Sequence, residues 1–156
     1  MSKKIYIQLA TLLITFLTSC TFVDVDPEPE RLASNELYSR RGVTIDLEWS
    51  TGGTDYDAVH EADIDLQLFL YGDLIASSER DYDFESVEIF DEDPRGTYDL
   101  DVIYYEGCRD VYYTLYITSS ETGDMITIDG HFDGCDGGDD YHTFHIRKDG
   151  DYYIVN

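Results

Sequence analysis

The sequence predicts an all-β protein built as an antiparallel β-sandwich of about eight or nine strands. Three observations predict it. Apolar and polar residues alternate in most segments after residue 42, turns rich in Gly, Asp and Pro separate these segments, and no segment there keeps helical spacing over three turns. The 14 tyrosines favour the same class, because aromatic side chains pack well on pleated surfaces. We therefore expect an immunoglobulin-like or jelly-roll-like sandwich.

The chain begins with a predicted secretion signal. Lys3 and Lys4 precede an apolar run, residues 5–17, that is too short to span a bilayer, and Leu17–Cys20 reads Leu-Thr-Ser-Cys. This tetrapeptide resembles the lipobox of bacterial lipoproteins. The resemblance implies that residues 1–19 are removed and that Cys20 carries the acyl anchor. It also implies an outer-membrane lipoprotein that faces the periplasm or the cell surface. An ordinary cleaved signal that happens to contain a cysteine is the alternative.

Residues 20–41 have the composition of an acidic tether. Pro27 and Pro29 favour an extended backbone, and the alternating acidic residues repel one another and stretch the segment. The folded domain is then expected over residues 42–156.

Alternation defines the strands of this domain in order. Apolar residues occupy every odd position from 43 to 49, every even position from 64 to 70, and every even position from 98 to 104. Turn signals at 71–73, 93–96, 121–124 and 148–151 mark the ends of neighbouring strands. The remaining strands are predicted at 74–76, 87–89, 113–117, 125–128, 141–147 and 152–155.

The order of these segments resembles the bacterial pre-peptidase C-terminal domain family, over residues 43–119. The resemblance is carried by a tryptophan strand, an alternating strand and a Gly-Thr-Tyr strand start, which here are Leu47–Ser50, Ala62–Leu70, Glu85–Ile89, Gly96–Val102 and Tyr113–Ile117. It implies a non-catalytic sandwich of the kind attached to secreted enzymes, some of which bind calcium or extended polymers. Residues 125–156 extend beyond the resembling region, and no catalytic domain is expected beside it.

The charge of the chain restricts its partners. The formal net charge is −24. Such a surface repels nucleic acid and anionic head groups, and it attracts divalent cations and basic partners. Nucleic-acid binding is therefore excluded, and the partner is expected to be a protein or a glycan that the sequence does not identify.

Three cysteines are present. The lipobox uses Cys20, and the remaining pair, Cys108 and Cys135, is expected to form a disulfide in the oxidising compartment outside the cytoplasm. A free-thiol or metal-binding role is the alternative, although no Cys-x-x-Cys spacing supports it.

Two acidic segments are candidate calcium sites, because calcium takes six to eight oxygen ligands at flexible geometry. The first segment supplies Asp55, Asp57, Glu61, Asp63 and Asp65 around the loop 52–63, and the second, weaker one supplies Asp133, Asp136 and Asp139. The second lacks the spacing of an EF-hand loop. Solubilising acidic loops without an ion are the alternative for both.

The sequence favours binding over catalysis. It has no Gly-x-Ser-x-Gly elbow, no His-Glu-x-x-His pair and no phosphate loop, and His142 and His145 are expected on opposite faces of one strand. We expect a non-catalytic binding or structural module, with calcium as the candidate cofactor. A small hydrolase that uses paired carboxylates is the alternative. Tyr105, Tyr112 and Tyr116 are expected on one outer face, either to bind a partner or to pair across strands.

Overall fold

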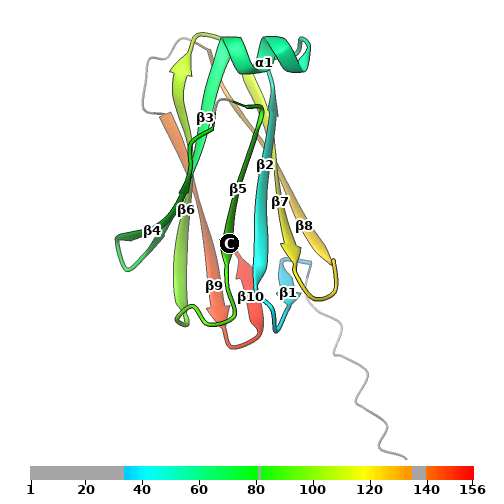
Figure 1. The fold of residues 1–156 in the computed structure, drawn as a ribbon, viewed down its shortest axis with the longest axis vertical. Helices are drawn as coiled ribbons and strands as arrows, with labels where there is room; N and C mark the ends of the chain where they lie inside the picture. The colour runs from blue at the N-terminus through cyan, green and yellow to red at the C-terminus, as the bar shows by residue number, and fades with distance from the viewer. Residues whose placement is uncertain (1–33, 81, 135–139) are drawn as a thin grey trace, which may run out of the picture. The chain divides into compact units, whose positions relative to one another are not determined.

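The computed structural model describes residues 34–80, 82–134 and 140–156. In this part of the chain, two antiparallel sheets pack face to face as a sandwich, and one short helix lies at an end of the strands (Figure 1). The predicted fold class is therefore confirmed. All nine predicted strands are present, and one further strand and the helix were not predicted.

The larger sheet, sheet A, has six strands in the order β1-β10-β9-β6-β3-β4. Their bounds are β1 Glu36–Tyr38, β10 Tyr152–Val155, β9 Asp140–Asp149, β6 Gly96–Gly107, β3 Ala62–Leu70 and β4 Asp73–Ser78.

The smaller sheet, sheet B, has four strands in the order β5-β2-β7-β8. Their bounds are β5 Phe84–Ile89, β2 Val43–Ser50, β7 Val111–Ser119 and β8 Met125–Phe132.

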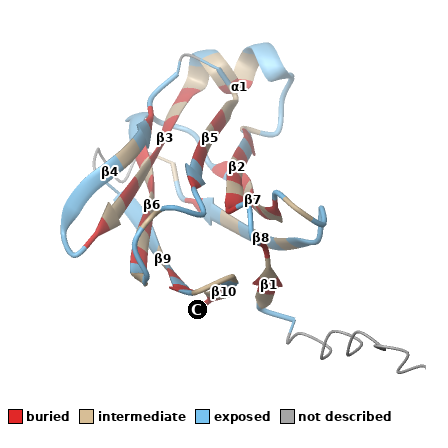
Figure 2. Cartoon of the chain, turned by 60° about the horizontal axis from the view of Figure 1, so that its bottom comes forward, coloured by how far each residue is buried: buried red, intermediate tan, exposed pale blue. Residues whose placement is uncertain are grey.

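Period-two burial builds the core. Ile45, Leu47, Leu66, Leu100 and Leu115 have no exposed area, and each lies on the inner face of its strand. Figure 2 shows the result, with buried residues alternating along the central strands and an exposed β4 hairpin beside them. Because apolar burial stabilises a protein by roughly 25 cal/mol per Å² of apolar area, the central strands contribute most of the stability.

The folded unit begins before residue 42. Glu36–Tyr38 pairs with β10, Leu37 is 3% exposed, and the Asn35 side chain donates a 3.0 Å hydrogen bond to the carbonyl of Val155. Part of the predicted tether is thus an edge strand. A three-residue strand is too short for its alternation to be recognised in the sequence, and it is stabilised by its long-range partner.

The helix α1, Asp55–Glu61, occupies the loop in which calcium ligands were predicted. Thr54 is its N-cap: the Thr54 backbone and hydroxyl each donate a 2.8 Å hydrogen bond to the Asp57 carboxylate, and the Asp57 backbone donates back to the hydroxyl at 3.3 Å. This capping box, together with the buried Ala58, stabilises a helix too short to form alone.

Two predictions about faces have different outcomes. Tyr104 and Tyr113 point inward, as expected, and are 7% and 3% exposed. The expectation that Tyr105, Tyr112 and Tyr116 share one outer face is wrong, because β6 belongs to sheet A and β7 to sheet B. The connection between β6 and β7 crosses the sandwich, so these side chains lie on opposite outer faces.

Candidate functional site

The structure places the first predicted set of calcium ligands on two elements, α1 and β3. Asp57 caps α1, and its hydrogen bonds with Thr54 lower the pKa of its carboxyl group. Glu61 forms a 2.9 Å ion pair with Arg109. Asp55 lies in the first turn of α1, where its charge is favourable to the helix dipole. Three of the five carboxylates therefore have structural roles around the helix.

The second predicted set is only partly described. Asp133 is exposed and lies 3.6 Å from the imidazole of His131, whereas Asp136 and Asp139 lie outside the described residues, as do Cys135 and Cys20. In the part of the chain that the structure describes, no three His, Cys, Asp or Glu side chains are grouped so that they could hold a metal ion.

The histidines on β9 are separated as predicted. His142, although exposed, bonds the Tyr113 hydroxyl at 2.5 Å and stacks on Phe132, both of which belong to sheet B, whereas His145 bonds Asp99 on the outer face of sheet A at 2.7 Å. These two side chains do not share a site.

The remaining two predicted ligands, Asp63 and Asp65, lie together on a hollowed surface. Both project from the outer face of β3, since the even-numbered residues 62–70 of this strand face the core. We call the hollow that contains both of them the Asp65 pocket. Its volume is about 480 Å³, and it is lined by Asp63, Asp65, Gln67, Glu79, Arg80, Ile103 and Tyr105.

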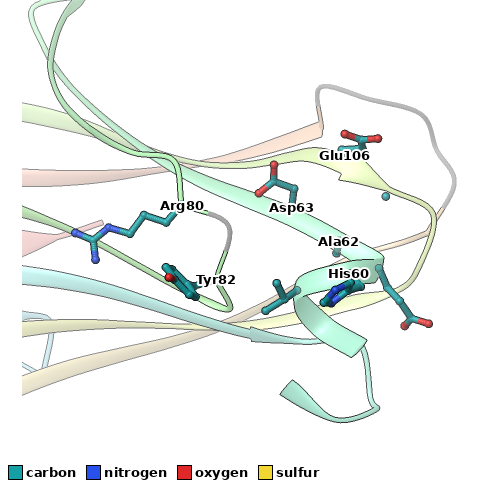
Figure 3. A pocket seen from close by; sticks show the side chains of 9 residues that line it. His60, Ala62, Asp63, Arg80, Tyr82 and Glu106 are labelled. Carbon is teal, nitrogen blue, oxygen red and sulfur yellow. The ribbon is translucent and has the colours of Figure 1, made fainter. Parts of the chain in front are cut away.

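A second hollow, the His60 pocket, adjoins the first and shares Asp63 and Arg80 with it. Its volume is about 330 Å³, and it lies between α1 and the ends of β3 and β6. Figure 3 shows that Arg80 extends its guanidinium group away from Asp63 and Glu106. The lining of the two pockets therefore holds one arginine and five carboxylates, which are Glu61, Asp63, Asp65, Glu79 and Glu106.

Asp65 is the most unusual residue of this surface. It is 8% exposed, although it lies on the outer face of the sheet, opposite Ile103 of β6. No hydrogen bond to its carboxylate comes from the described residues. Burial, together with the negative charges of Asp63, Glu79 and Glu85, raises the pKa of Asp65 to about 7.

Glu85 holds the backbone next to the Asp65 pocket in place through hydrogen bonds. Its side chain is fully buried, accepts a hydrogen bond from the Ser78 hydroxyl, and accepts a second from the Arg80 backbone at 2.8 Å. The Ser86 backbone in turn donates to the Ser78 hydroxyl at 3.2 Å. Burial raises the pKa of Glu85, and the Ser78 hydrogen bond opposes that rise. The network fixes the segment that carries Glu79 and Arg80.

Sequence reasoning identified Asp63 and Asp65 but missed the rest of the pocket. Ile103 and Tyr105 are distant in sequence and are brought to Asp65 by the β3–β6 register, whereas Glu79 follows β4 and is brought there by the β3–β4 pairing. The one available signal was the outward parity of residues 63, 65 and 67, which predicts a polar outer face and not a pocket.

The fold and the pocket define a β-sandwich with an acidic surface site. No protein-family model, curated protein or solved structure matches the chain. The resemblances to bacterial lipoproteins and to the pre-peptidase C-terminal family stay predictions. Among the described residues, no helix is long and apolar enough to cross a membrane.

Proposed function

We propose that this protein is a lipid-anchored, extracytoplasmic β-sandwich that works by binding and not by turnover. The lipobox Leu17–Cys20 supports the anchor and the outer-membrane location. The acidic residues between Cys20 and β1 support a tether that holds the domain away from the bilayer. In this proposal the anchor is the contact with the membrane, and the sandwich carries the binding site.

The observation that carries the binding function is Asp65, which is 8% exposed as a residue, lines a pocket, and has no hydrogen-bond donor to its carboxylate among the described residues. A carboxylate that has lost much of its hydration and has no hydrogen-bond donor lowers the stability of a folded protein. A ligand that supplies positive charge would remove that cost, so the pocket is suited to a cation. We therefore propose a cation-binding module.

Calcium titration of matched variants tests this function. The mature chain, residues 20–156, is compared with Asp65→Asn and with Glu88→Gln, which removes an exposed carboxylate from sheet B. Each is titrated by calorimetry with calcium chloride and with a blocked oligo-arginine peptide. At least one cation is expected to bind the mature chain and the Glu88 variant, and to lose that binding in Asp65→Asn. If all three proteins respond alike to both cations, the function is refuted.

The disulfide and the calcium cofactor belong to the same proposal. Gly134 packs against the backbone of Arg109 and Asp110, and its amide donates a 2.9 Å hydrogen bond to the Asp110 carboxylate. This contact supports a disulfide between Cys108 and Cys135, because Cys108 directly precedes Arg109 and Cys135 directly follows Gly134. Calcium remains the candidate cofactor, and a melting curve with calcium and with a chelator tests it.

One observation favours the alternative, a small hydrolase. A carboxyl group with a pKa of about 7 beside further carboxylates is suited to act as a general acid. Release of reducing sugar or peptide from a panel of polymers, abolished in Asp65→Asn and kept in Glu88→Gln, would establish that activity in place of binding.

A further inference from the structure

The Asp65 pocket combines the carboxylate of a largely buried residue with an aromatic surface. Tyr105 is 60% exposed and lines the same pocket as Asp65. It lies in β6, two residues after Ile103. Ile103 is paired directly with Asp65 in the sheet. The carboxylate therefore has an apolar residue beside it and an exposed aromatic ring at the edge of the pocket.

These neighbours discriminate between kinds of cation. Calcium requires six to eight oxygen ligands, and no metal-holding group of three acidic, His or Cys side chains occurs within the described residues. A hydrated metal ion also gains nothing from Ile103. A guanidinium group is planar and weakly hydrated, forms paired hydrogen bonds with a carboxylate, and stacks on an aromatic ring. The pocket matches the second description.

The charge around the pocket extends the same preference along the surface. The neighbouring His60 pocket adds Glu61 and Glu106, of which Glu61 is paired with Arg109. A ligand with several basic groups would place one at Asp65 and another toward Glu106. Neutral sugars donate hydrogen bonds, but they would leave the charge of Asp65 without a counter-charge.

We propose that the Asp65 pocket binds an arginine side chain of a basic polypeptide, with the Asp65 carboxylate as the ion-pair partner and the Tyr105 ring as the stacking surface. This inference rests on the cation-binding function proposed above and names the class of its ligand. Asp63 and Glu79 form the acidic rim of the pocket and favour the approach of a basic segment.

The test uses the blocked oligo-arginine peptide and a matched peptide in which citrulline replaces arginine. Citrulline keeps the shape of the side chain and removes its charge. The mature chain is expected to bind the arginine peptide and not the citrulline peptide. Asp65→Asn is expected to weaken arginine binding by tenfold or more, about the value of one charge-assisted hydrogen bond. Tyr105→Leu is expected to weaken it by about threefold, the value of an exposed cation–π contact.

Glu88→Gln is the control for general attraction to an anionic protein, and it should bind the arginine peptide as the mature chain does. Fluorescence of Trp49, which is 5% exposed, checks that each variant is folded. Equal loss in the Asp65 and Glu88 variants would overturn the inference, as would equal binding of the two peptides. Calcium binding that depends on Asp65, without peptide binding, would overturn the inference and leave the cation-binding function in place. If the mature chain binds neither calcium nor the arginine peptide, both the inference and the cation-binding function are refuted.

Discussion

Replacing Asp65 by Asn should stabilise the protein at neutral and alkaline pH. The pKa of Asp65 is about 7 in the folded protein, against the ordinary value of 3.8. The folded state thus holds this proton more tightly than the unfolded state. Stability that comes from the protonated carboxyl group is fully present below pH 3.8 and is lost as the pH rises through 7. Asn has no charge to bury, so it does not lose this stability.

The magnitude follows from the size of the pKa shift. A difference of about three pKa units corresponds to about 4 kcal/mol at most. Contact of the carboxylate with water in the pocket reduces this value, so we expect Asp65→Asn to exceed the original protein by about 2 kcal/mol at pH 8. The difference between the two proteins should be close to zero at pH 4.

Urea denaturation measures the effect. Trp49 is the single tryptophan of the chain and is buried, so its fluorescence reports unfolding directly. Free energies of unfolding are compared between pH 4 and pH 8 for the original protein, Asp65→Asn and the Glu88→Gln control. The free energy of unfolding of the Glu88→Gln control, relative to that of the original protein, should not increase with pH. A difference between Asp65→Asn and the original protein that stays constant with pH would refute the reasoning, because it would mean that Asp65 titrates alike in both states.

Four further predictions concern other parts of the molecule. Lys148→Met should lower stability by about 2 kcal/mol in urea denaturation, because Lys148 is 3% exposed and its ammonium group donates three hydrogen bonds to loop carbonyls at 2.6, 2.6 and 2.8 Å. Gly130→Ala should cost about 1–3 kcal/mol, since a Cβ there would lie 2.2 Å from the Tyr113 ring; an unchanged urea midpoint would contradict this. Cys108→Ser should lower the melting temperature by the equivalent of about 2–4 kcal/mol under oxidising conditions and leave it unchanged under reducing ones. Cys20→Ser should abolish incorporation of labelled fatty acid, and continued labelling would exclude the predicted anchor.

The structure also shows how a chain of charge −24 keeps buried charges. Glu85 and Lys148 are both inside, yet each has its own set of partners: Glu85 has the Ser78 hydroxyl and the Arg80 amide, and Lys148 has three carbonyls. Burial lowers the pKa of Lys148, although the surrounding acidic residues oppose this. Asp65 is the contrast, because the charges that shift its pKa, those of Asp63, Glu79 and Glu85, are all negative, and no described residue donates a hydrogen bond to its carboxylate.

The part of the fold that could be predicted is the part that depends on neighbouring residues. Alternation in residues 43–49 identifies β2 because each of its inner residues is buried by the same repeating geometry. The helix α1 escaped because seven residues give too little periodicity. Its capping signal was present in Thr54 and Asp57, but the same residues also fit a calcium loop. Strand β1 escaped because its stability comes from β10, more than 100 residues away.

The sequence alone determined that this protein forms strands, where most of them lie, and which side chains of β2, β3, β6 and β7 face inward. These properties follow from local parity, which hydrophobic burial enforces along the central strands. Only the tertiary structure decided which sheet each strand joins, and hence that Tyr105 lies beside Asp65 and not beside Tyr112. Several distant segments have a similar pattern and could pair with one another, and the packing of the whole core determines which pairs form.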